Sequence, residues 1–129
     1  MNIVPLQRLT SVWPDVRQWI CDAIEYGQGD ENELDVFMAL AQGRYVLFHS
    51  EGKFAAVVQI TQYPRQQVAT VIYAGGPGSL HAMEQTVEDM KPWLRQHGIS
   101  ALRIWGRAGW EKVLKMKRKG VILQVELAS

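Results

Sequence analysis

The chain has 129 residues, with 47% hydrophobic and 21% charged residues and a formal net charge of +1. This is the size of one globular domain, so we expect residues 1–129 to fold as a single unit, and the near-neutral charge argues against a dedicated nucleic-acid binder. The single cysteine, Cys21, excludes an intramolecular disulfide. No apolar run reaches about 18 residues, the length of a membrane span, so we expect a cytoplasmic protein without a membrane segment.

The N-terminal segment predicts a short strand followed by a helix. Pro5 interrupts residues 1–9, which favours an edge strand or an extended lead-in. From Thr10 or Ser11, apolar residues recur at helical spacing as far as residue 24. We expect Pro14 in the first turn of this helix, where an amide hydrogen is not needed.

An acidic cluster marks the start of a second predicted helix. Asp30 has the position of an N-cap, and Glu33 would complete a capping box with it. Together with Glu31, these carboxylates suit the positive end of a helix. A metal or amine-binding site is the alternative interpretation, and we favour the charged first turn. Gly43 is expected to end this helix.

A meander of three strands follows the helices. Strands are predicted at residues 44–49, 54–61 and 68–74, with turns at 50–53 and 63–67. The second and third strands are almost continuously apolar, which indicates central strands covered on both faces.

The second half of the chain alternates helices and strands. An amphipathic helix is predicted from near Ser79 to residues 96–98, then a strand at 99–105, a basic helix at 107–119 and a last strand at 121–127. Antiparallel strands followed by this alternation imply an α/β (α+β) fold, in which helices flank a central, mixed and mostly antiparallel sheet.

The junction between the third meander strand and the following helix is rich in glycine. Gly75, Gly76 and Gly78 permit positive φ angles and a close approach of the backbone to a ligand. The first amides of the next helix lack partners and lie at the positive end of its dipole. The expected ligand is a phosphate or pyrophosphate, although a simple sharp turn has the same pattern.

This order of elements, with the glycine junction after the meander, resembles the GNAT superfamily of acyl-CoA-dependent N-acyltransferases over nearly the whole chain. That family binds the pyrophosphate of coenzyme A at this junction through a Q/R-x-x-G-x-G/A motif. Here residues 73–78 read YAGGPG, and Gly76 and Gly78 match the two glycines. The resemblance implies acetyl-CoA or another acyl-CoA as co-substrate, held by Ala74, Gly75, Gly76, Gly78, Ser79 and Arg107. The run around Arg107 is also similar to GNAT-like proteins of bacteriophage genomes.

The sequence departs from the family at the positions that carry catalysis. Tyr73 replaces the leading Gln or Arg, and Pro77 lacks an amide that could face the phosphates. Trp110 stands where the family has a tyrosine acid, and an indole cannot protonate a thiolate. The second and third meander strands hold no carboxylate base, so His49 is the best ionisable candidate, with a solvent-facing histidine of no catalytic role as the alternative.

Two functions therefore stay open. The first is an N-acyltransferase that modifies a small-molecule or peptide amine. The second is a GNAT-fold module without catalysis, used for binding or structure in phage assembly or host interaction. The basic residues within 107–119 have three interpretations: a solvated face, an attraction for the phosphates of coenzyme A, or a contact with nucleic acid. We expect contact with nucleic acid least. The three histidines lack metal-site spacing, and a homo-oligomer is compatible with the sequence.

Overall fold

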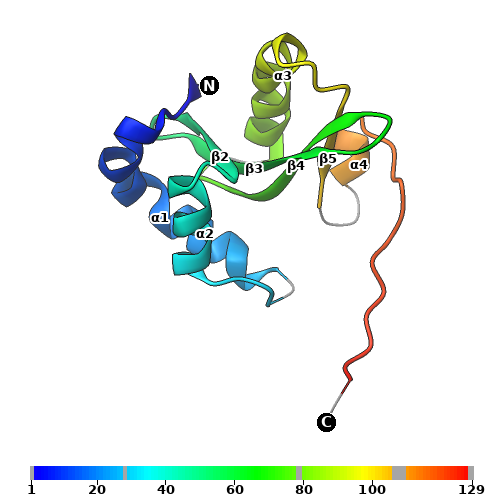
Figure 1. Cartoon of the computed structure of the whole chain (residues 1–129), viewed down its shortest axis with the longest axis horizontal. Coiled ribbons are helices and arrows are strands. Elements are labelled where there is room, and N and C mark those ends of the chain that lie inside the picture. Colours follow the sequence, from blue (N-terminus) through cyan, green and yellow to red (C-terminus); the bar gives the residue numbers. More distant parts are fainter. Residues whose placement is uncertain (1, 28, 78–79, 106–109, 128–129) are drawn as a thin grey trace.

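The computed structural model describes residues 2–27, 29–77, 80–105 and 110–127 (Figure 1). The elements in chain order are β1 (Asn2–Ile3), the 3-10 helix η1 (Leu6–Arg8), α1 (Leu9–Glu25), α2 (Glu33–Ala41), β2 (Tyr45–Ser50), β3 (Phe54–Gln62), β4 (Gln67–Gly75), α3 (Leu80–Gln96), β5 (Ala101–Ile104) and α4 (Trp110–Val113).

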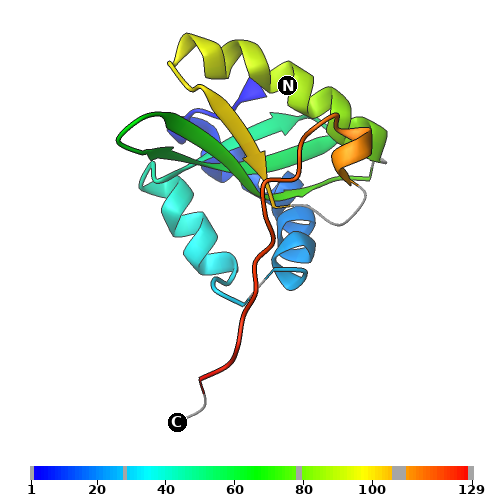
Figure 2. The same ribbon diagram turned by 90° about the vertical axis from the view of Figure 1, so that its right-hand side faces the viewer.

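The strands form one sheet in the order β1-β2-β3-β4-β5. Neighbouring strands are antiparallel from β1 to β4, and only β4 and β5 are parallel among the described strands. Helices α1 and α2 cover one face, and α3 and α4 cover the other (Figures 1 and 2). The predicted fold class, a mixed and mostly antiparallel sheet between helices, is confirmed.

Each face of the sheet has its own apolar core. Val57 and Leu47 point toward α1 and α2, whereas Val58 and Phe48 point toward α3. Neighbouring residues of a strand point to opposite faces, so a strand that is buried on both sides must be apolar throughout. Residues 54–58 of β3 are all buried, which confirms the prediction of a central strand.

A β-bulge interrupts the pairing of β3 with β4. Val57 pairs with Tyr73 and Val58 pairs with Val71, which leaves Ile72 without a partner of its own. Ile72 and Tyr73 therefore both pack on the α1–α2 side, although they are consecutive in the strand. An extra residue of this kind bends a strand and re-aims its side chains.

Local turn signals in the sequence agree with the structure. Gly43 after α2, Gly52 in the β2–β3 hairpin and Gly98 after α3 have φ angles of +75°, +71° and +72°. These backbone conformations strain other residues, which explains glycine at each position. The meander strands lie within two residues of their predicted bounds.

The starts of α1 and α2 differ from the prediction. Because η1 leads directly into α1 at Leu9, Pro14 lies inside the helix rather than in its first turn. Pro14 is exposed, as is Thr10 one turn earlier, so water can reach the carbonyl that proline leaves without a donor. The cap of α2 is Asn32, not Asp30.

Asn32 and Asp35 form the capping box of α2. The Asn32 side chain accepts from the Asp35 amide at 2.9 Å, and the Asp35 carboxylate accepts from the Asn32 amide at 2.9 Å. The amide oxygen of asparagine caps as well as a carboxylate does, so either Asp30 or Asn32 could begin the helix by preference alone. The predicted box is two residues too early, and Glu31 lies outside the helix.

The predictions for the last helix and the last strand differ from the structure. In the described part of the basic helix expected at 107–119, only Trp110–Val113 is helical, and the helix cannot continue past Lys115, which has a φ of +55°. Residues 114–127 contain no strand, and the expected strand at 121–127 is an extended, exposed segment (Figures 1 and 2). A strand forms only where another strand supplies hydrogen bonds, and none of the described strands lies against this segment.

In the described residues, no helix combines the length and the apolar character that crossing a bilayer requires.

Candidate functional site

The parallel pairing of β4 with β5 ends beside the glycine junction. Its last pair is Val71 with Ile104, and the Trp105 amide still donates to the Val71 carbonyl at a long 3.5 Å. Beyond this point β4 continues for four residues, of which Ile72 is the bulge and residues 73–75 pair with β3 alone in the described part of the chain. Ligands of α/β sheets commonly bind at the carboxyl ends of parallel strands. The bulge at Ile72 thus coincides with the place where the two strands separate.

The residues predicted to hold the cofactor lie at this point or outside the described residues. Ala74 is half-buried and packs against the core on the α3 side. Gly75 ends β4, and Gly76 follows it. Gly78, Ser79 and Arg107 lie outside the described residues, so their predicted roles remain predictions.

Gly75 and Gly76 are required by contacts within the chain. A Cβ atom on Gly75 would lie 2.9 Å from the carbonyl oxygen of Trp19, and one on Gly76 would lie 2.2 Å from that of Lys53. Neither glycine has a positive φ. Close packing against α1 and the β2–β3 turn therefore explains both glycines, and their predicted contact with a ligand stays a prediction. The junction is therefore fixed against two other parts of the protein.

A carboxylate joins the strands on the α1–α2 side of the same region. Glu31 accepts hydrogen bonds from the hydroxyl of Tyr45 at 2.8 Å and from that of Tyr73 at 2.9 Å. Tyr45 belongs to β2 and Tyr73 to β4, so the carboxylate bridges two strands that flank β3. Tyr73 also faces Gly27 at the end of α1, where an added Cβ would be 3.7 Å from the tyrosine ring.

Burial and the nearby carboxylate keep both tyrosines protonated. Burial raises the pKa of Tyr45 to about 12, and the hydrogen bond to Glu31 and its negative charge act in the same direction. The pKa of Tyr73 is raised for the same reasons, in the same order. Both hydroxyls therefore donate at neutral pH. A carboxylate has roughly four acceptor positions, so Glu31 can accept further hydrogen bonds from a cation such as an ammonium group.

The sequence prediction missed the position of Glu31. The acidic cluster is typical of the first turn of a helix, yet of its three members only Glu33 lies in α2. Glu33 forms a salt bridge with Arg17 of α1, in which Nη2 donates to Oε2 at 2.9 Å. The alternative interpretation of the cluster, a metal or amine-binding site, stays a prediction.

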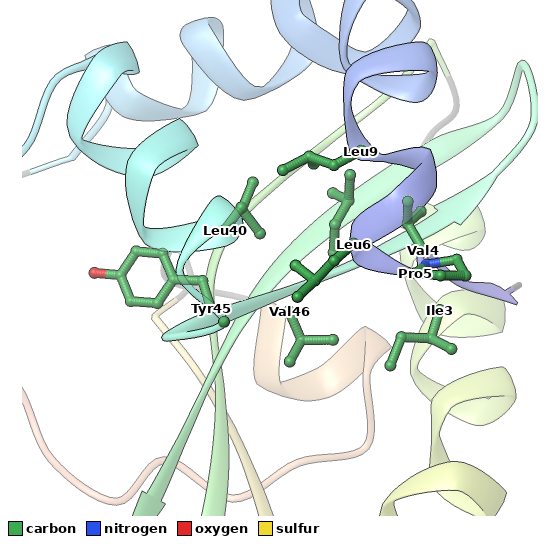
Figure 3. A pocket seen from close by; sticks show the side chains of 10 residues that line it. Ile3, Val4, Pro5, Leu6, Leu9, Leu40, Tyr45 and Val46 are labelled. Carbon is green, nitrogen blue, oxygen red and sulfur yellow. The ribbon is translucent and has the colours of Figure 1, made fainter.

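His49 does not lie at the junction. It belongs to the end of β2 and lines a polar cavity of about 260 Å³ together with Arg8 and Asp15. Its Nε2 atom is buried and has no hydrogen-bond partner within the described structure, while the residue as a whole is half-buried. A second cavity, of about 220 Å³, is apolar and lies under η1 at the β1–β2 edge (Figure 3). Neither cavity is lined by residues of the glycine junction.

The basic segment is partly neutralised by carboxylates. Arg118 donates to Glu111 at 2.7 Å, and the Lys115 ammonium lies 3.9 Å from Glu84 of α3. Trp110 is partly buried and packs against the core on the α3 side. These contacts favour the interpretation of the described part of this segment as a solvated face.

Comparison with known proteins identifies the fold. No protein-family model matches the sequence, and no curated protein matches it significantly. Solved structures match over nearly the full length. A probable acetyltransferase has a TM-score of 0.62 at 12% identity, with 100% of this chain and 98% of that chain covered. A possible acetyltransferase from Clostridium difficile 630 has a TM-score of 0.62 at 9% identity, with 99% and 97% covered. A protein from Thermus thermophilus has a TM-score of 0.61 at 13% identity, with 100% and 98% covered. The fold is GNAT-like, and nothing in these comparisons supports a bacteriophage origin.

Proposed function

We propose that this protein is an acyl-CoA-dependent N-acyltransferase that binds its acyl-CoA at the β4–α3 junction. The observation that carries the proposal is the end of β4–β5 pairing at Val71 and Ile104, directly before the junction. The backbone of residues 72–75 is left without a β5 partner there, within the described part of the sheet. The likeness to structures named as acetyltransferases supports the same assignment at the level of fold.

The junction suits the anionic part of such a substrate. The first amides of the 17-residue helix α3 have no carbonyl partners within the helix, and its dipole adds positive charge at that end. Backbone amides near Gly76, Gly78 and Ser79 would hold the pyrophosphate. The contacts of Gly75 with Trp19 and of Gly76 with Lys53 fix this backbone in advance, which lowers the entropy lost on binding.

Glu31 is the residue we assign to the acceptor amine. Its carboxylate is tied to Tyr73, which lies two residues before Gly75. An ammonium group is attracted to this anion and transfers a proton to it, which leaves a neutral amine as the nucleophile. The acyl-CoA supplies the thioester that the amine attacks. On attack the amine nitrogen loses its second proton, and water relays this proton to the departing thiolate, because Trp110 cannot donate one.

Calorimetric titration with acetyl-CoA tests the proposal. We expect saturable binding below millimolar concentrations, and no heat of binding at millimolar acetyl-CoA would reject it. Variants at Gly75 or Gly76 are unsuitable, because any side chain there meets backbone atoms. Gly78→Trp is the better variant and should abolish binding while the protein stays folded. Gly120→Trp is the matched control, because no atom lies within 4 Å of an added Cβ at that position.

A GNAT-fold binding module without catalysis is the second candidate. It is favoured by Trp110, which packs in the core where the family has its acid. The two candidates differ in thiol release. An enzyme releases free coenzyme A when acetyl-CoA and a panel of primary amines are supplied together, and Glu31→Gln reduces that rate. A binding module takes up acetyl-CoA and releases none.

A further inference from the structure

The C-terminal segment 121–127 has the sequence of a buried strand but lies in solvent. Five of its seven residues are large and apolar, and their exposed fractions run from 59% for Ile122 to 90% for Leu127. Val121, Leu123, Val125 and Leu127 alternate with the other positions, which is the pattern of a strand with one buried face. Contiguous apolar surface of this kind marks an interaction site.

The sheet has an open edge that fits such a strand. β5 is the last strand of the sheet, and no described strand pairs with its outer edge. Leu102 and Ile104 of β5 are only partly buried and lie at the margin of the core under α3 and α4. Trp105, directly after β5, is 56% exposed. A strand added here would extend both the hydrogen-bonded sheet and this core.

We propose that two copies of this protein exchange their C-terminal segments, so that residues 121–127 of each copy pair with β5 of the other. Each copy carries one unpaired segment and one open edge, so a two-fold dimer satisfies both pairs at once and leaves neither exposed. The segment runs away from the body of its own chain in both views, as a donated strand does (Figures 1 and 2).

The charges on the two strands support the pairing of this segment with β5. When Leu123 and Val125 face the core beside Leu102 and Ile104, the intervening residues of the segment face the opposite side of the sheet. That side of the segment carries Glu126, and the same side of β5 carries the exposed Arg103. Arg103 lies over the Tyr63 ring, 5.5 Å from its centroid, and the Glu126 carboxylate accepts a hydrogen bond from Gln124 of its own segment. Opposite charges on paired strands fix their choice of partner.

The first test is the oligomeric state of the full chain by sedimentation equilibrium. We expect a dimer. The double variant Leu123→Asp, Val125→Asp should raise the dissociation constant of the dimer by about tenfold or more, since each substitution removes an apolar side chain that the dimer buries. Leu34→Asp, at a leucine of α2 that is 66% exposed, is the matched control and should leave the dimer unchanged. A wild-type chain that stays monomeric up to concentrations of about 100 micromolar overturns the proposal.

Charge reversal separates exchange between copies from pairing within one chain. Arg103→Glu and Glu126→Arg each place like charges together in a homodimer and should weaken it. An equimolar mixture of the two variants should restore the dimer, because both interfaces of the mixed pair join opposite charges. One interface has the native Arg103–Glu126 pair, and the other has the same pair with its charges exchanged. If the segment folded onto β5 of its own chain, mixing would change nothing, and a monomer with the segment protected from hydrogen exchange would overturn the proposal in the same way.

Discussion

Removal of the Glu31 carboxylate should lower the stability of the protein. Glu31→Ala leaves the hydroxyls of Tyr45 and Tyr73 without their acceptor. Hydrogen bonds to a charged group contribute about 1.5–3 kcal/mol each, or about 3–6 kcal/mol for two. Both bonds are only partly buried, and water replaces part of each, so we expect a smaller loss of about 2–4 kcal/mol in the free energy of unfolding. Glu31→Gln keeps one acceptor oxygen and should lose about half as much.

Urea unfolding followed by tryptophan fluorescence measures this loss. Glu33→Ala is the matched control, because Glu33 is a neighbouring carboxylate in an exposed salt bridge with Arg17, and such bridges contribute at most about 1 kcal/mol. A loss for Glu31→Ala no larger than the loss for Glu33→Ala would show that the two tyrosine hydrogen bonds do not stabilise the fold. Tyr45→Phe and Tyr73→Phe, each combined with Glu31→Ala, form two double-mutant cycles. Each tyrosine should show a coupling energy to Glu31 of about 1 kcal/mol.

Three further predictions concern pH, packing and capping. The pKa of Tyr45 is raised from 10 to about 12, so the stability that its protonated hydroxyl contributes is complete below pH 10 and is lost as the pH rises toward 12. The urea midpoint should therefore fall between pH 10 and pH 12, and it should fall less in Tyr45→Phe. Gly76→Ala should destabilise the protein by about 2 kcal/mol or more through its approach to the Lys53 carbonyl, whereas Gly120→Ala should change the thermal midpoint little; equal midpoints would contradict the packing at the junction. Asn32→Ala should cost about 1 kcal/mol through loss of the α2 cap, while Asp30→Ala should be near neutral, and the reverse ranking in urea unfolding would favour the cap predicted from sequence.

Local patterns account for the parts of the fold that could be predicted from the sequence. The meander strands, the helix α3 and the turns at Gly43, Gly52 and Gly98 depend on neighbours within a few residues, so periodicity and glycine placement find them. The junction at 75–78 is found in the same way, and its position after the third meander strand leads to the GNAT-like fold.

The missed features depend on residues far apart in the chain. Glu31 meets Tyr45 and Tyr73 across 14 and 42 positions, and no local signal distinguishes it from its acidic neighbours. Gly76 is a glycine because Lys53 passes beside it, which a motif cannot reveal. Residues 121–127 have a correct strand pattern and no partner strand among the described strands, because the pattern reports which face a strand would bury and not where it pairs.

The claim that acyl-CoA binds at the β4–α3 junction is tested by mapping the chemical shifts of the backbone amides during a titration with acetyl-CoA. We predict that the largest shifts fall on Tyr73, Gly75 and Gly76 and on the first turn of α3. The apolar cavity under η1, reported by Leu6 and Leu40, should show none. Shifts confined to that cavity, or no shifts at millimolar acetyl-CoA, would contradict the claim.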